Sequence, residues 1–248
     1  RGGRPQRVAA RSAAGVAARS TGEGPRVTKA RRRERAAKIV AELRRLYGDA
    51  DCARHHASAL QLLVATVLSA QCTDERVNLV TPALFGKYRS AADYANADLP
   101  TLMEEIRSTG FFQNKAKALV GLGKALVERH GGTVPDRMED LVGLPGVGRK
   151  TANVLLGTWF GKPAIPVDTH VTRLVARLDL SKESDPVKIE RDLMELLEES
   201  DWTFASHALI WHGRKVCNAR KPLCETCTLR PLCPYPAAPR REGVGAVR

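Results

Sequence analysis

The sequence predicts an all-α fold, and the spacing of its apolar residues is the main reason. Apolar residues recur at helical intervals along the chain, as Ile39, Leu43 and Leu46 do before Gly48. No segment shows the strong two-residue alternation of a half-buried strand. Gly and Pro separate the periodic segments, which indicates helices joined by turns. The 248 residues are enough for one large domain or two modest ones.

The expected helices follow one another from the basic start of the chain to its cysteines. Asp136, with Glu139 three residues later, has the pattern of a capping box. Asp168 and Asp185 are expected as N-caps, and Pro186 suits a first helical turn. On these signals helices are predicted over residues 31–49, 58–70, 78–88, 99–110, 114–132, 134–144, 149–161, 168–180, 185–201 and 204–217.

Positive charge is concentrated at the start of the chain. Residues 1–38 hold twelve Lys or Arg and two acidic residues, which is +10 of the net +13. We predict a basic, disordered tail over residues 1–32 and a flexible tail over 237–248. Three interpretations of the basic tail stay open: a solvated segment, an arm that binds polyanions, and a transit peptide. The longest apolar stretch, Ala59–Ala70, is too short to span a bilayer, so no membrane association is expected.

A tight turn, "LPGVG" at Leu144–Gly148, separates two predicted helices. Gly146 and Gly148 permit unusual backbone conformations or a close approach to the backbone. The amides that open the second helix suit a phosphate, although a plain helix–helix turn would have the same spacing. The pattern resembles the helix-hairpin-helix motif, which binds a DNA phosphate without reading sequence. That resemblance implies that this turn contacts DNA.

Lys150 lies in the first turn of the helix that follows, where acidic residues are usually preferred. It is interpreted either as a phosphate contact or as a nucleophile, because a helix N-terminus and burial both lower a lysine pKa. The segment "GKPAIPV", residues 161–167, is long enough to return and place Asp168 beside Lys150. Asp168 can serve this pair, cap its own helix, or do both.

Four cysteines lie within seventeen residues, in the pattern Cys-x6-Cys-x2-Cys-x5-Cys. Such a cluster predicts a metal site, and spacing alone leaves both zinc and an iron–sulfur cluster open. Arg220 and Lys221, in the loop between the first two cysteines, are either a solvated surface or a second phosphate contact. The predicted ligands are Cys217, Cys224, Cys227 and Cys233.

The cysteine spacing and the motifs "LSAQCTD", "LPGVGRKTANVLL", "VDTHVTRL" and "HGRKVC" together resemble the endonuclease III family of bifunctional DNA glycosylases and AP lyases. The resemblance covers residues 34–236 and favours a 4Fe–4S cluster over zinc. It implies two helical domains with a DNA-binding cleft between them. One is a six-helix domain with the helix-hairpin-helix, 53–162, and the other a discontinuous iron–sulfur cluster domain, 33–52 plus 163–236.

The resemblance also implies a role for each residue in base-excision repair. Lys150 attacks the sugar of a flipped oxidised pyrimidine nucleotide, and Asp168 stabilises the developing positive charge or helps to deprotonate the lysine. A Schiff base then forms, and β-elimination cuts the abasic strand. Gln71 fills the space left by the flipped base, and Phe111 wedges into the opposite strand. The expected DNA contacts are Gln71, Phe111, Leu144, Gly146, Gly148, Arg149, His170, Arg220 and Lys221.

Some interpretations remain open at this stage. Phe111 is otherwise a core residue, His170 either faces the pocket or packs beneath it, and Asp74 either caps a helix or lines the pocket. Cys72 and Phe112 depart from the family pattern, where a small residue and a tyrosine are expected. The alternative functions are a monofunctional adenine mismatch glycosylase and a non-catalytic iron–sulfur DNA-binding protein. A monomer acting on double-stranded DNA is expected, in the cytoplasm with the nucleoid if the chain is bacterial, or else in an organelle or nucleus.

Overall fold

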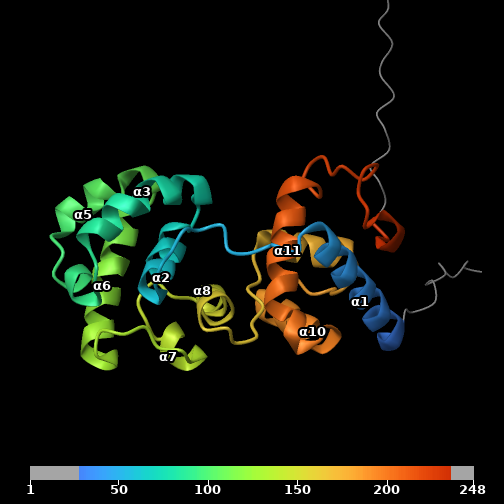
Figure 1. Cartoon of the computed structure of the whole chain (residues 1–248), viewed down its shortest axis with the longest axis horizontal. Coiled ribbons are helices and arrows are strands. Elements are labelled where there is room, and N and C mark those ends of the chain that lie inside the picture. Colours follow the sequence, from blue (N-terminus) through green and yellow to red (C-terminus); the bar gives the residue numbers. More distant parts are fainter. Residues whose placement is uncertain (1–27, 236–248) are drawn as a thin grey trace, which may run out of the picture.

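The computed structural model describes residues 28–235, and within them the chain forms helices and no β-strand (Figure 1). The all-α prediction is therefore confirmed. Residues 1–27 and 236–248 lie outside the described part, so the tail predictions stay untested there. The first helix begins at Lys29, inside the segment assigned to the basic tail, because the Thr28 side chain caps it by accepting a hydrogen bond from the Arg31 amide.

Each segment predicted to be helical overlaps an α-helix, although several helices begin a few residues earlier than predicted. The short helix Ala91–Ala95 was not predicted, and the predicted helix 149–161 changes at Leu155 into a π-helical turn, Leu155–Trp159. No helix among residues 28–235 is long and apolar enough to cross a membrane. The helices are α1 (Lys29–Leu46), α2 (Ala59–Leu68), α3 (Asp74–Lys87), α4 (Ala91–Ala95), α5 (Leu99–Glu105), α6 (Phe112–His130), α7 (Met138–Val142), α8 (Arg149–Val154), α9 (Thr169–Arg177), α10 (Pro186–Leu196) and α11 (Trp202–Lys215).

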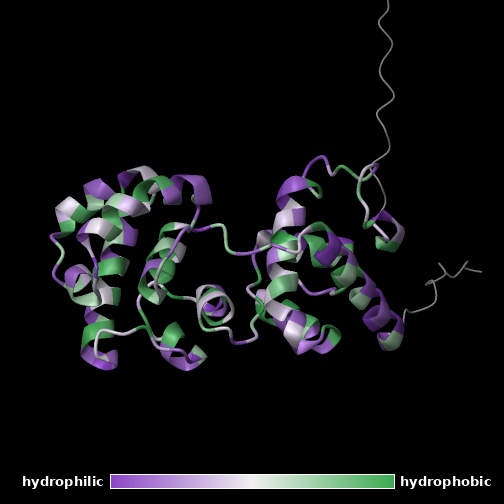
Figure 2. Ribbon diagram, in the orientation of Figure 1, coloured by the Kyte–Doolittle hydropathy of each residue, from purple (hydrophilic) through white to green (hydrophobic). Residues whose placement is uncertain are grey.

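The helices form two lobes, each with its own hydrophobic core. The core of the first lobe, α2–α8, includes Leu62, Leu119 and Leu155. The second lobe combines α1 with α9–α11, and its core includes Ile39 and Leu174. Figure 2 shows apolar residues on the inward sides of the helices and polar residues outside. The two-domain, discontinuous architecture is confirmed, whereas the exact limits of the domains stay a prediction.

The N-cap predictions succeed at two positions and fail at a third. Asp168 and Asp185 each accept a hydrogen bond from the main-chain amide three residues further on. The capping box at Asp136 is wrong, because α7 starts without any side-chain cap. The Asp136 carboxylate instead accepts a hydrogen bond from Lys162 Nζ at 2.6 Å. The Asp136 carboxylate is therefore paired with a lysine 26 residues away in the sequence and does not cap α7.

Candidate active site and nucleic-acid interface

The turn between α7 and α8 uses its two glycines for different purposes. Gly146 has φ +77°, a conformation that other residues rarely adopt, and a Cβ there would lie 3.0 Å from the Ala118 Cβ. Gly148 has an ordinary φ of −94°, and nothing lies within 4 Å of the place where its Cβ would be. Gly146 is thus required by the shape of the turn, whereas Gly148 leaves open space beside the backbone.

The apolar residues of the same turn are anchored in the core of the first lobe. Leu144 is 3% exposed, so a contact from this residue to DNA would have to use its main chain. The turn leads directly into α8, whose first amides have no acceptor within the helix. Lys150 is the second residue of this helix, as predicted.

A cavity of about 340 Å³ lies where the two lobes meet. Lys150 projects into it from α8 of the first lobe, and Asp168 comes from the N-terminus of α9 in the second lobe. The structure therefore brings together the two residues that the sequence paired. The other lining residues are Asp51, Cys52, Ala53, Arg54, Ser69, Cys72, Asp74, Val154, Pro166, Thr169, His170, His207, Ile210, Trp211 and Arg214.

The environment of Lys150 lowers the pKa of its amine below that of a free lysine. The side chain reaches solvent inside the cavity, but the surrounding walls remove much of its hydration and so lower its pKa. The charge of Asp168 opposes this shift, and those of Arg54 and Arg214 reinforce it. No direct ion pair joins Lys150 to Asp168 in the described part of the chain. An amine without a bound carboxylate is easier to deprotonate, as a nucleophile must be.

Asp168 and His170 lie on the second-lobe wall of the cavity. One carboxylate oxygen of Asp168, Oδ1, accepts the Val171 amide at 2.8 Å, so this residue caps α9 while its charge acts on Lys150. His170 lines the cavity, which favours the pocket interpretation over packing beneath it. Burial chiefly, with the charge of Arg173, lowers the pKa of His170, which favours a neutral ring near pH 7.

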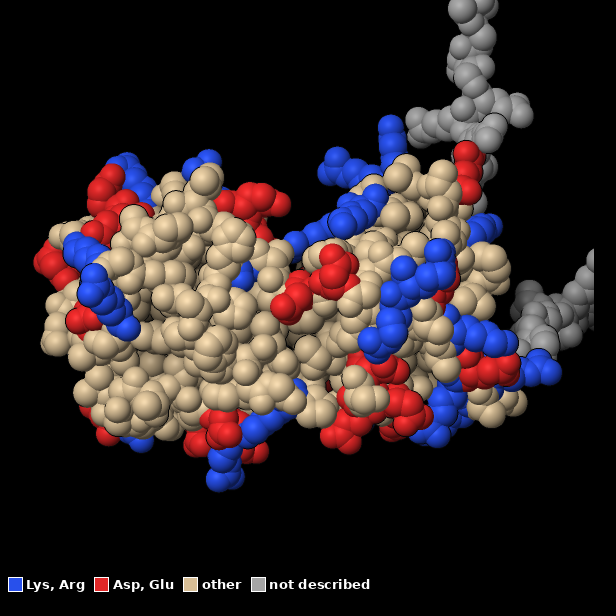
Figure 3. Space-filling model, viewed as in Figure 1, with Lys and Arg blue, Asp and Glu red and all other residues tan. Residues whose placement is uncertain are grey.

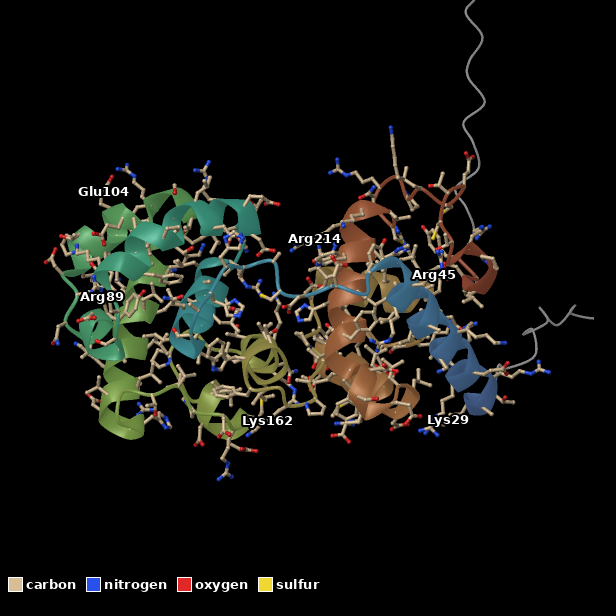
Figure 4. The ribbon with its side chains drawn as sticks, in the orientation of Figure 1. Lys29, Arg45, Arg89, Glu104, Lys162 and Arg214 are labelled. Atoms are coloured by element: carbon tan, nitrogen blue, oxygen red, sulfur yellow. The ribbon has the colours of Figure 1, made fainter. Side chains whose placement is uncertain are left out.

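Asp74 is the first residue of α3 and lines the cavity, as the pocket interpretation expects, whereas the interpretation as a helix cap is wrong. Thr73 provides the cap. The Asp74 carboxylate pairs with Arg54 at 3.3 Å and with Arg214 of α11 at 2.8 Å. Figure 4 shows Arg214 on α11, beside the space between the lobes. This bridge joins the two lobes at the cavity and holds two positive charges near Lys150.

Several cavity residues were not found from the sequence. His207, from α11, is 6% exposed and contacts the Thr158 hydroxyl, in the π-helical turn, at 3.2 Å between Nε2 and Oγ1. Arg54 lies in the irregular segment between α1 and α2, where no periodicity marks it. Arg214 belongs to the motif "HGRKVC", which is part of the family resemblance, and that motif could have identified it as a candidate site residue. Cys72, which departs from the family pattern, also lines the cavity.

Gln71, predicted to fill the space of the flipped base, and Phe111, predicted to wedge into the opposite strand, lie at exposed turns of the first lobe. Phe111 is 63% exposed, which excludes the core interpretation. Gln71 is also exposed and follows α2. Both line a groove of about 280 Å³, together with Gly146 of the tight turn. The structure thus places both side chains and the turn along one groove.

The HhH-GPD superfamily of base excision DNA repair proteins matches residues 64–199, which include Lys150 and Asp168. The endonuclease III of Synechocystis sp. is 54% identical over 206 residues, which cover 83% of this chain and 94% of that protein. The chain belongs to the endonuclease III family. A non-covalent endonuclease III–DNA complex is 41% identical, with a TM-score of 0.79 over 82% of this chain and 95% of that one. A trapped covalent endonuclease III–DNA intermediate is 40% identical, with the same TM-score and coverage.

Of the other DNA contacts predicted for this endonuclease III family member, Arg149 has a protein partner in the structure. Its guanidinium pairs with Glu190 of α10, so it reaches across to the second lobe. Arg220 and Lys221 are exposed. Figure 3 shows Lys and Arg side chains along the edge of the second lobe that faces the first. DNA contacts by these three residues stay predictions.

The four cysteines of this family member line one apolar cavity beside α9. Arg177, at the end of α9, donates a hydrogen bond to Cys217 Sγ at 3.1 Å and to the carbonyl of Asn218 at 2.8 Å. Within residues 28–235, no three Cys, His, Asp or Glu side chains are grouped closely enough to hold a single metal ion. The cysteines share one cavity without that close grouping.

Proposed function

We propose that this base-excision repair enzyme, a DNA glycosylase and AP lyase, uses Lys150 as its nucleophile on duplex DNA that contains oxidised pyrimidines or abasic sites. The observation that carries the proposal is the Lys150 amine, with its lowered pKa, in a cavity shared with Asp168. The trapped covalent complex of a relative supports it, since a covalent link needs a nucleophile on the enzyme.

The reaction follows from these positions. The neutral Lys150 amine attacks C1′ as the bond to the base breaks and the base leaves with a proton. Asp168, whose charge faces this cavity, stabilises positive charge on the sugar or takes the proton that Lys150 gives up. Opening of the sugar ring then breaks the C1′–O4′ bond while O4′ takes up a proton. The protonated imine left between C1′ and Lys150 acidifies the proton at C2′. Loss of that proton breaks the C3′–O bond and cuts the strand.

The same proposal assigns the DNA-binding surface. The main-chain amides after Gly148 would hold a backbone phosphate, because the space beside that glycine is open. Gln71 and Phe111 would enter the duplex while the damaged nucleotide occupies the cavity of about 340 Å³. Arg220 and Lys221 would contact phosphates on the other side of the cleft. His170 would face the flipped nucleotide.

We further propose that the four cysteines hold a 4Fe–4S cluster. A single zinc ion needs four thiolates each about 2.3 Å from one point, whereas a cubane spreads its ligands over a larger body. The four cysteines around one apolar cavity support a shared metal centre, and their spacing, which resembles that of the family, favours the cluster over zinc. When bound, the cluster would brace the loop carrying Arg220 and Lys221. Iron and sulfide assays on wild type and Cys224→Ser test this assignment, and stoichiometric zinc without iron would contradict it.

Borohydride trapping on a duplex with one thymine glycol or abasic site tests the catalytic assignment. The wild type and Lys162→Ala, a lysine bound to Asp136 away from the cavity, are expected to give a covalent adduct. Lys150→Ala is expected to give none while still binding DNA. If none of the three proteins gives an adduct, the monofunctional or non-catalytic alternative is favoured. An adduct with Lys150→Ala would mean that another amine is the nucleophile.

A further inference from the structure

A buried lysine connects two turns at the surface of the first lobe. Lys115, on α6, is only 5% exposed. Its Nζ donates hydrogen bonds to two main-chain carbonyls, that of Leu68 at 2.8 Å and that of Thr109 at 2.7 Å. Leu68 ends α2, and Thr109 ends the short 3-10 turn before α6. One ammonium group therefore joins two segments that are distant in the sequence.

These two turns carry the proposed wedge residues. Gln71 follows Leu68 by three residues, and Phe111 follows Thr109 by two. Both have positive φ angles, 51° and 49°, and among residues 28–235 only one other non-glycine residue does. Such conformations are unfavourable for residues that carry a Cβ, and they persist only where surrounding contacts hold them. Lys115 provides a contact of that kind to both turns at once.

Burying a charged ammonium group to connect the two turns is energetically unfavourable. Burial opposes its charge and lowers its pKa. The two carbonyls offset part of that cost, and each is a charge-assisted hydrogen bond. Lys115 also lines the groove of about 280 Å³ that Gln71 and Phe111 border. The Lys115 ammonium group therefore lies at the groove, where it can hold the Gln71 turn and the Phe111 turn together.

We propose that Lys115 is a positioning residue that locks the Gln71 and Phe111 turns together, so that both side chains enter the duplex as one preorganised unit. This inference rests on the proposed function, because it needs both residues to act on DNA. Without the link, each turn would have to be ordered separately at the moment of base flipping, which slows flipping and leaves the later chemistry at Lys150 unaffected.

Two substrates separate base flipping from the chemistry at Lys150. The first is a duplex with one thymine glycol, where the base must be flipped. The second is an abasic site in a single strand, where no partner strand has to be opened. For Lys115→Met, which keeps the length of the side chain without its donors, single-turnover excision from the duplex is expected to fall by about tenfold or more. Borohydride trapping on the single strand is expected to stay within about twofold of the wild type.

The matched control is Lys124→Met, an exposed lysine on the same helix, which removes one charge and is expected to leave both rates unchanged. Equal losses on both substrates with Lys115→Met would overturn the proposal in favour of a general structural role. A wild type that traps neither substrate would instead overturn the proposed function. If Lys115→Met does not fold, Lys115→Gln, which keeps an amide donor, takes its place under the same criteria.

A double-mutant cycle tests whether Lys115 acts through the wedge. In the background Gln71→Ala plus Phe111→Ala, the change Lys115→Met is expected to have little further effect on duplex excision, because the residues it positions are already gone. A further loss as large as in the wild-type background would show that Lys115 acts elsewhere.

Discussion

Arg149 and Glu190 form a bidentate ion pair that connects the two lobes. Arg149 Nε donates to Glu190 Oε2 at 2.7 Å, and Nη2 donates to Oε1 at 2.9 Å. Glu190 is 5% exposed, whereas the Arg149 side chain is 46% exposed. Arg149 immediately precedes Lys150, so a carboxylate of α10 restrains the first turn of the helix that carries the proposed nucleophile.

The first prediction concerns this pair. Arg149→Met is expected to lower the free energy of unfolding by about 1–3 kcal/mol, because it leaves the Glu190 carboxylate buried without a partner. The double variant Arg149→Met plus Glu190→Met is expected to recover most of that loss, since it removes the buried charge. Urea unfolding of the three proteins measures both effects. If the double variant is no more stable than Arg149→Met, the buried carboxylate is not the cause.

The second prediction concerns pH. Because burial lowers the pKa of Lys150, the rate of imine formation on an abasic site should rise with pH along a limb centred below 10.5. Below that pKa the amine is protonated and inactive, and above it the limb levels off. Arg214→Met removes a charge that lowers this pKa, so the limb should move to higher pH. Asp168→Asn removes a charge that raises it, so any residual activity should shift to lower pH. Borohydride trapping rates of the wild type and both variants, measured across pH, test these shifts. If Arg214→Met and Asp168→Asn moved the limb in the same direction, the electrostatic account would be contradicted.

The third prediction concerns Arg177 and the cysteine loop. Its guanidinium binds Cys217 Sγ and the carbonyls of Asn218 and Ala219. Arg177→Met should therefore loosen residues 217–221, seen as faster hydrogen exchange there and less iron retained per chain. Arg173→Met serves for comparison, because Arg173 binds the Cys217 carbonyl but none of the residues that follow it. Unchanged exchange in Arg177→Met would mean that the loop is held by other contacts.

The fourth prediction separates stability from function at Phe111. Phe111→Asn should raise the free energy of unfolding by about 1 kcal/mol, since Asn tolerates the left-handed conformation and little apolar burial is lost. The same variant should excise a paired lesion more slowly, because the proposed wedge is gone. Denaturant unfolding and single-turnover excision provide the two readouts. A destabilised variant would show that Phe111 contributes packing despite its exposure.

The repeating apolar pattern determined the helices, because burying one face of a helix needs only local periodicity. The tight turn, Lys150, Asp168 and the four cysteines were also readable, since each belongs to a compact motif with its own chemistry. Asp136 shows the limit of such local signals. Its sequence context favours a cap, but in the fold α7 begins at Met138 without a side-chain cap and the Asp136 carboxylate pairs with Lys162.

Tertiary structure decided which further residues share the cavity with Lys150 and Asp168, and which residues hold them in place. Arg54, Asp74 and Arg214 come from three separate segments, and Lys115 and Glu190 act on residues of other elements. No spacing in the sequence encodes such contacts. They arise because the two lobes pack against each other, and packing sets the distances between charges that determine pKa values and ion pairs. The sequence by itself therefore determined the helices and the chemical groups, and only the packed fold determined their partners.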